Sequence, residues 1–114
     1  MTTIKAIARQ FGIKTYFVWQ PAAMYHNPPD LNAQHEREFV SRWPEGYGPH
    51  SQSYYGYPRM AEVFAQSSGD ASMIWCADSF LQATSRLYVD MVHYNGYGAG
   101  LLADCIADRI TAAQ

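Results

Sequence analysis

The sequence predicts an α/β domain built on a parallel sheet, with helices and strands alternating along the chain. Two observations carry this prediction: helical apolar periodicity near both ends, and two short runs of aromatic and β-branched residues between helical segments. Strands separated by helices are typical of βα units, whose strands run parallel. A length of 114 residues is enough for one domain, so we expect residues 1–114 to belong to a single domain.

The N-terminal segment is predicted to form a helix followed by a strand. Thr3 can cap the start of a helix over residues 3–11, and Gly12 can end it. Its apolar residues recur at helical spacing and are Ile4, Ile7, Ala8 and Phe11. Residues 15–20 form a nearly continuous apolar run that ends at Pro21, which is typical of a strand buried on both faces of a parallel sheet.

The middle of the chain is predicted to contain loops and two helices. Residues 22–30 and 44–49 are rich in turn-forming residues, and a helix over residues 33–43, capped by Asn32, lies between them.

The second of these helices is predicted over residues 53–66, although Gly56 and Pro58 leave its start open. Its apolar face comprises Met60, Val63 and Phe64. A short buried strand follows at residues 72–76, and residues 79–87 include a candidate helical turn.

The last predicted helix covers residues 98–110. Its apolar residues have helical spacing and are Leu101, Leu102, Cys105, Ile106 and Ile110. The whole pattern contains two strands, whereas sheets usually have about four to six. We therefore expect the chain to be part of a larger domain.

Composition excludes some classes of function. The formal net charge is -2 and no block of like charge is present, which argues against nucleic-acid binding. We find neither a basic amphipathic membrane helix nor a run of about 18 apolar residues, so no membrane span is expected. The first residues lack the continuous apolar region of a signal peptide, and the cellular compartment is left open.

Two cysteines, Cys76 and Cys105, lie far apart and form no CxxC pair. The favoured interpretation is two buried thiols. A disulfide is the alternative if the protein is secreted.

The candidate catalytic residues are Asp90 and His93, three positions apart and just before the last helix. At this spacing the carboxylate can accept a hydrogen bond from Nδ1 of the imidazole, which leaves Nε2 free to take a proton. A hydroxyl nucleophile needs such a base because its own pKa is far above neutral. The spacing alone is a weak signal, and its alternative is an ordinary turn with a polar histidine.

The context of this pair is more informative. A D-x-x-H sequence followed by Gly98 and by a helix containing Leu102 and Ala103 resembles the last block of SGNH (GDSL-type) serine hydrolases. The strand at 16–19 with its Gln-Pro ending, and the strand at 73–76 with the Asp-Ser-Phe after it, resemble late segments of the same family. The resemblance implies a flavodoxin-like three-layer α/β/α fold with a parallel sheet, of which this chain is the C-terminal part.

The same resemblance implies hydrolysis of a small-molecule or carbohydrate ester in a longer parent protein, with Asp90 orienting His93 as the general base and without a cofactor or metal. The family's serine lies in a G-D-S motif near the start of the domain, and its oxyanion blocks lie before the histidine. Neither is found here; the nearest match, Gly69-Asp70-Ala71-Ser72, has alanine where serine belongs, and Ser72 is too near the histidine. We therefore expect the chain alone to be inactive.

There are two rival functions. A metal site made of the four histidines is disfavoured because their spacing matches no compact ligand pattern; these residues are His26, His35, His50 and His93. A carbohydrate-binding or interaction module is the main non-enzyme alternative, because tyrosines cluster between residues 47 and 57 and tyrosine can stack on sugars. These tyrosines are Tyr47, Tyr54, Tyr55 and Tyr57.

Two structural expectations follow. Asp90 and His93 should lie together at the carboxyl end of the sheet, where open α/β folds bind ligands. If neighbouring strands are absent, Phe17, Val18 and Trp19 should be unusually exposed, and self-association through an open sheet edge is expected.

Overall fold

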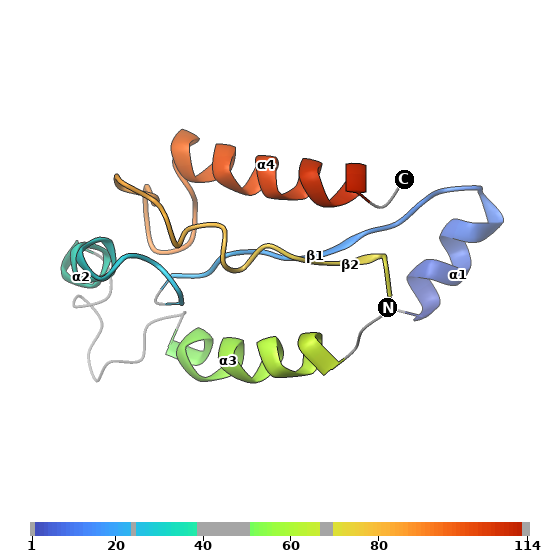
Figure 1. Ribbon diagram of the computed structural model, residues 1–114, viewed down its shortest axis with the longest axis horizontal. Helices are drawn as coiled ribbons and strands as arrows, with labels where there is room; N and C mark the ends of the chain where they lie inside the picture. Colours follow the sequence, from blue (N-terminus) through green and yellow to red (C-terminus); the bar gives the residue numbers. More distant parts are fainter. Residues whose placement is uncertain (1, 24, 39–50, 67–69, 113–114) are drawn as a thin grey trace.

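The computed structural model describes residues 2–23, 25–38, 51–66 and 70–112 (Figure 1). Its elements in chain order are α1 (Thr2–Gln10), β1 (Phe17–Trp19), α2 (Pro29–Glu38), α3 (Ser51–Gln66), β2 (Met73–Trp75) and α4 (Gly96–Ala112). Helices alternate with strands as the sequence predicts, so the described part of the chain has a mixed α/β architecture.

The two strands pair in parallel, which confirms the predicted pairing. Phe17, Val18 and Trp19 lie opposite Met73, Ile74 and Trp75 in that order. Both strands are shorter than predicted. Helices α4 and α3 lie on opposite sides of the strand pair (Figure 1), and among the described residues the sheet contains these two strands.

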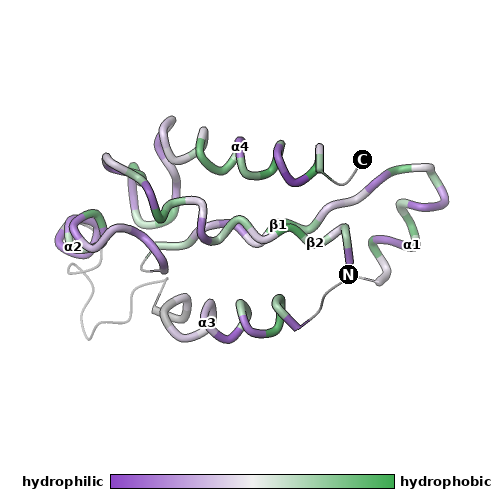
Figure 2. Tube along the Cα trace, viewed as in Figure 1, coloured by the Kyte–Doolittle hydropathy of each residue, from purple (hydrophilic) through white to green (hydrophobic). Residues whose placement is uncertain are grey.

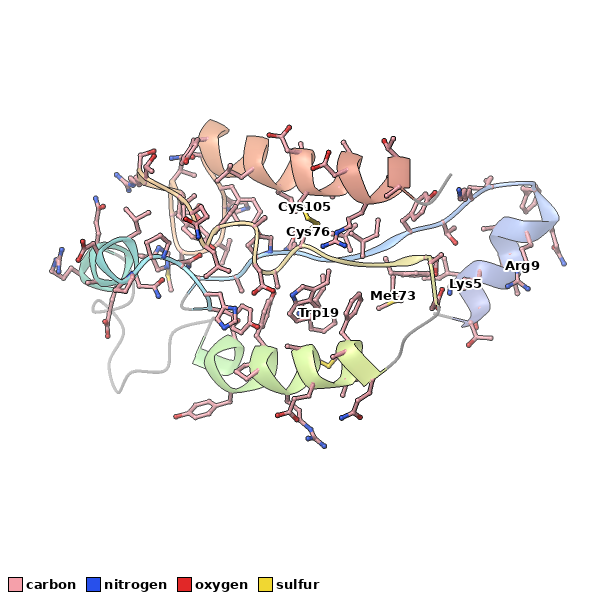
Figure 3. The ribbon with its side chains drawn as sticks, viewed as in Figure 1. Lys5, Arg9, Trp19, Met73, Cys76 and Cys105 are labelled. Carbon is pink, nitrogen blue, oxygen red and sulfur yellow. A yellow bond between two sulfur atoms is a disulfide. The ribbon has the colours of Figure 1, made fainter. Side chains whose placement is uncertain are left out.

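The two faces of the strand pair carry different side chains because successive residues of a strand point to opposite sides. Trp19 and Trp75 are register partners and stack with 6.1 Å between ring centroids on the side of α3. There Tyr57 contacts Trp19 and Phe64 contacts Trp75, at centroid distances of 5.8 and 5.4 Å. Figure 3 shows Trp19 between the strands and α3, and Figure 2 shows the hydrophobic stretch at the strands.

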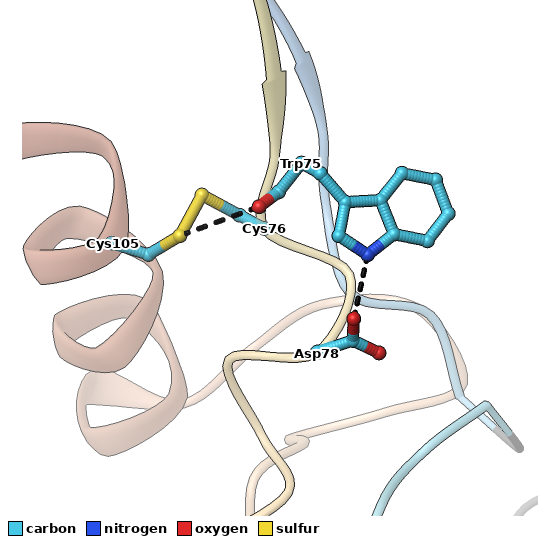
Figure 4. Close-up of a disulfide and its surroundings, with 4 residues drawn as sticks. All are labelled: Trp75, Cys76, Asp78 and Cys105. Carbon is cyan, nitrogen blue, oxygen red and sulfur yellow. Dashed lines mark hydrogen bonds between the residues drawn. A yellow bond between two sulfur atoms is a disulfide. The ribbon is translucent and has the colours of Figure 1, made fainter. Parts of the chain in front are cut away.

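A disulfide joins the end of β2 to α4, so the favoured interpretation of two thiols is wrong. Cys76 and Cys105 lie with their Cα atoms 6.0 Å apart and are covalently bonded (Figure 4). The physical reason is the packing of α4: its predicted apolar face, which includes Cys105, turns toward the strand pair and brings this residue over Cys76. The bond ties α4 to the sheet.

Helix α1 ends as predicted but does not pack as predicted. Gly12 has φ 66°, and the N–H groups of Gly12 and Ile13 donate to the carbonyls of Arg9 and Ala8, which is the hydrogen-bond pattern of a glycine-terminated helix. The helix begins at Thr2, so the predicted cap at Thr3 is wrong.

The predicted apolar face of α1 is largely outside the core, since Ala8 alone among its four residues is buried. Ile4, Ile7 and Phe11 are more than half exposed. The helix is held by an ion pair from Lys5 to Asp70 of 2.5 Å. Phe17, Val18 and Trp19 are half-buried, so the predicted exposure of β1 is seen only in part, and the more exposed apolar side chains lie on α1.

The other helices differ from prediction mainly at their starts. Helix α2 begins at Pro29, because proline suits a first helical position, and Asn32 lies inside the helix rather than capping it. Helix α3 begins at Ser51 and continues through Pro58. Val63, expected on its inner face, is 44% exposed. The predicted loop at 44–49 lies outside the described residues.

No described helix is long and apolar enough to cross a membrane.

Candidate functional site

The segment from Tyr88 to Asn95 forms a tight loop that presents Asp90 and His93. Tyr88 and Tyr94 form an antiparallel bridge, and the N–H of Val89 donates to the carbonyl of His93 at 2.9 Å. The loop rests on the buried core, which comprises Ala23, Phe80, Ala83, Leu87 and Tyr88. The base of the loop is therefore fixed while its tip stays in solvent.

Within the loop, Asp90 holds His93 in one orientation. Oδ2 of Asp90 lies 2.8 Å from Nδ1 of His93, as the sequence predicts, while Oδ1 accepts the backbone N–H groups of Val92 and His93 at 2.8 Å each. The pKa of Asp90 is lowered to about 2 by its hydrogen bonds. The largest contribution is from the backbone N–H of Val92, followed by the backbone N–H of His93 and then by the imidazole. An ionised carboxylate can only accept hydrogen bonds, so in the neutral imidazole Nδ1 carries the proton and Nε2 has the lone pair.

His93 borders a cleft of about 250 Å³. The cleft is lined by Gln20, Pro21, Ala22, Ala23, Tyr57, Tyr88, Val92, His93 and Tyr94. The first four of these residues directly follow β1, so the cleft lies at the carboxyl end of the strand. This is the location predicted for the Asp90–His93 pair and the usual ligand position in open α/β folds.

Two tyrosine hydroxyls hold the walls of the cleft. Tyr94 donates to the carbonyl of Pro21, and Tyr57 donates to the carbonyl of Gln20 at 3.0 Å. Burial raises the pKa of both tyrosines above its ordinary value. Both hydroxyls therefore remain protonated near neutral pH and act as donors that join the loop and α3 to the segment after β1.

Asn95 connects the loop to α4. Its Oδ1 accepts the N–H of Gly98 at 2.9 Å, which caps the helix, and its Nδ2 donates to the carbonyl of Arg86 at 2.6 Å. Asn95 is not among the site residues predicted from the sequence. An asparagine immediately before a glycine-containing helix is the signal that could have revealed it.

Gly98 lies close against the core, and we expect Gly98→Ala to destabilise the fold. A Cβ there would lie 2.8 Å from the carbonyl oxygen of Leu87 and 3.3 Å from both Cζ of Phe80 and Cβ of Tyr94. Because the nearest atom is backbone, α4 has to shift, at a cost of about 1–3 kcal/mol. Urea unfolding measures this loss. Gly100→Ala is the control, because a Cβ at Gly100 meets nothing within 4 Å; equal stabilities of the two variants would contradict the prediction.

Of the other candidate residues from the sequence, Ser72 and Tyr55 lie away from the cleft, whereas Tyr57 lines it. Oγ of Ser72 donates to Asp70 at 2.6 Å just before β2, at the opposite end of the parallel strands from the cleft. Tyr55 lies on α3 and is 76% exposed, whereas Tyr57, on the same helix, lines the cleft, so these two do not share one stacking surface.

The remaining candidates are two histidines and two tyrosines. His35 is buried against Tyr88. His50, Tyr47 and the side chain of Tyr54 fall outside the described residues. Within the described part, no three His, Cys, Asp or Glu side chains gather as metal ligands.

A second histidine–carboxylate pair was missed by sequence reasoning. Nδ1 of His26 lies 2.5 Å from Oδ1 of Asp78, although the residues are 52 positions apart. No sequence pattern predicts this contact, because the contact forms only when the ends of β1 and β2 lie side by side.

Comparisons with known proteins identify no family or function for the chain. No protein-family model, no curated protein and no solved structure matches it.

Proposed function

We propose that this chain is the C-terminal part of an SGNH-type serine hydrolase that cleaves esters in a longer parent protein. Asp90 orients His93, and Nε2 of His93 removes the proton from a serine supplied by a segment outside these 114 residues. The observation that carries the proposal is the 2.8 Å contact from Asp90 to Nδ1 of His93 beside a cleft at the carboxyl end of β1.

The chemistry requires this arrangement. A serine hydroxyl attacks an ester only when a base takes its proton, and the imidazolium formed is stabilised by the ionised carboxylate on its other nitrogen. The low pKa of Asp90, about 2, keeps the carboxylate charged over the whole neutral range. The imidazole is 73% exposed, which leaves room for a nucleophile and a substrate to approach.

The resemblance of residues 90–103 to the last block of the family supports the fold part of the proposal. So do the parallel strands with helices on both sides (Figure 1). In the parent, further strands would pair with the open edges of the sheet, and the apolar face of α1 would pack on that extended sheet as helices of βα units do.

The test is an ester-hydrolysis assay on the polypeptide extended upstream in its reading frame, compared with residues 1–114 alone. We expect a G-D-S motif upstream and saturable turnover of p-nitrophenyl esters by the extended protein. The chain alone should show no saturable, enzyme-like turnover, because it contains neither the serine nor the oxyanion donors. An extended protein without such a motif, and without activity, would refute the assignment.

A further inference from the structure

A second imidazole–carboxylate pair lies outside the Asp90–His93 loop. Nδ1 of His26 contacts Oδ1 of Asp78 at 2.5 Å. Oδ2 of the same carboxylate accepts a hydrogen bond from Nε1 of Trp75 at 2.7 Å, which Figure 4 shows. Trp75 is the last residue of β2, and His26 follows β1. The contact therefore joins segments that leave the same end of the two parallel strands.

The imidazole of His26 is held in one orientation. Asp78 is fixed by the indole N–H of Trp75. An ionised carboxylate can only accept hydrogen bonds, so in the neutral imidazole of His26 Nδ1 carries the proton and Nε2 has the lone pair. The ring of His26 stacks on that of Tyr25 with 4.0 Å between centroids and 15° between planes. The side chain is 52% exposed, so small molecules can reach the ring.

The backbone at His26 is unusual as well. Its φ is 47°, and among the described residues it is the one non-glycine position with positive φ. Such a conformation persists only where the surroundings impose it, and it occurs often at functional sites. Here the stacking on Tyr25 and the contact with Asp78 are the interactions that hold it.

We propose that His26, oriented by Asp78, is an acyl-accepting imidazole for small activated esters such as aryl acetates, independent of the serine-dependent reaction. The lone pair of Nε2 attacks the carbonyl carbon, a C–N bond forms, the ester C–O bond breaks and the phenolate leaves. Water then adds to the acyl group, the C–N bond breaks, a carboxylate is released and two protons go to solvent, which regenerates neutral imidazole. No further reactant is needed.

Asp78 promotes the first of these steps. Positive charge develops on the imidazole while the C–N bond forms, and the carboxylate on Nδ1 stabilises that charge without having to reorganise, because Trp75 already holds it. We expect the second-order rate constant of the chain to exceed that of free imidazole at the same pH about tenfold, which corresponds to about 1.4 kcal/mol in the barrier.

The experiment measures p-nitrophenolate release from p-nitrophenyl acetate by residues 1–114. His26→Asn removes the imidazole, and asparagine tolerates positive φ better than most residues do, so the backbone is kept. We expect this variant to lose most of the rate. Asp78→Asn keeps an acceptor for Trp75 but removes the charge, and should lower the rate about tenfold. Asp104→Asn, an exposed aspartate on α4, is the matched control and should match wild type.

Peptide mapping after diethyl pyrocarbonate treatment identifies the most reactive histidine, and we expect the fastest modification at His26. A rate unchanged by both His26→Asn and Asp78→Asn, or a rate equal to that of free imidazole, would overturn the proposal. Loss of the rate in His93→Ala but not in His26→Asn would transfer the activity to the other pair. None of these outcomes bears on the upstream serine, so the proposed hydrolase function is tested separately.

Discussion

Asp90→Asn should lower kcat of the proposed serine hydrolase, the chain extended upstream, about 10⁴-fold, with a much smaller change in KM. The asparagine side chain can still fill the loop, but its amide lacks the charge that stabilises the imidazolium. It can also present a donor to Nδ1, which reverses the tautomer of His93 and leaves its Nε2 protonated. His93→Ala should cost at least as much, because the base itself is then absent.

The measurement is steady-state hydrolysis of p-nitrophenyl esters by the extended protein, with Asp104→Asn as a control aspartate of the same chain. Asp104 is exposed on α4 and lies outside the cleft lining, so this variant should retain wild-type kcat. Activity that survives both Asp90→Asn and His93→Ala would show that another group performs the reaction.

The stability of the loop that carries Asp90 should decrease at low pH. The pKa of Asp90 is about 2 in the folded chain, below the value of about 3.9 for an unfolded aspartate. A lowered pKa means that the ionised carboxylate stabilises the folded loop above about pH 4, and that this stabilisation is lost as the pH falls toward 2. The orientation of His93 by a charged Asp90 should therefore persist across the whole neutral range.

Removal of the disulfide should destabilise the chain by roughly 3–4 kcal/mol. Cys76 and Cys105 are 29 positions apart, and closing a loop of that length in the unfolded chain gives this magnitude in the chain-entropy account. The loss is large because net stabilities of small domains are only about 5–15 kcal/mol. The bond also anchors α4, whose first turn contacts the core through Gly98, so the Asp90–His93 loop should loosen with it.

Urea unfolding of the chain, with and without a phosphine reductant, measures this effect. Reductant should lower the midpoint of the wild-type chain to that of the Cys76→Ser/Cys105→Ser variant, and it should leave the midpoint of that variant unchanged. Equal midpoints for the oxidised wild type and the double variant would show that the disulfide does not stabilise the fold.

Much of the secondary structure could be predicted from local sequence patterns. The end of α1 at Gly12 follows from the need for a left-handed backbone there, which glycine adopts without steric cost. The last helix was placed by the spacing of its apolar residues, and both strands by short aromatic and β-branched runs. The contact between Asp90 and His93 was predictable because both lie in one turn, three residues apart.

Other features were decided by the tertiary structure. The Cys76–Cys105 bond depends on α4 lying over the end of β2, which the spacing of two cysteines does not encode. The pairing of His26 with Asp78 depends on the parallel register of β1 and β2, which places two distant segments at one end of the sheet. The sequence by itself determined the local elements and the Asp90–His93 turn, since these depend on neighbours within a few residues. The disulfide, the second histidine pair and the cleft depend on long-range packing, and only the folded chain brings their residues together.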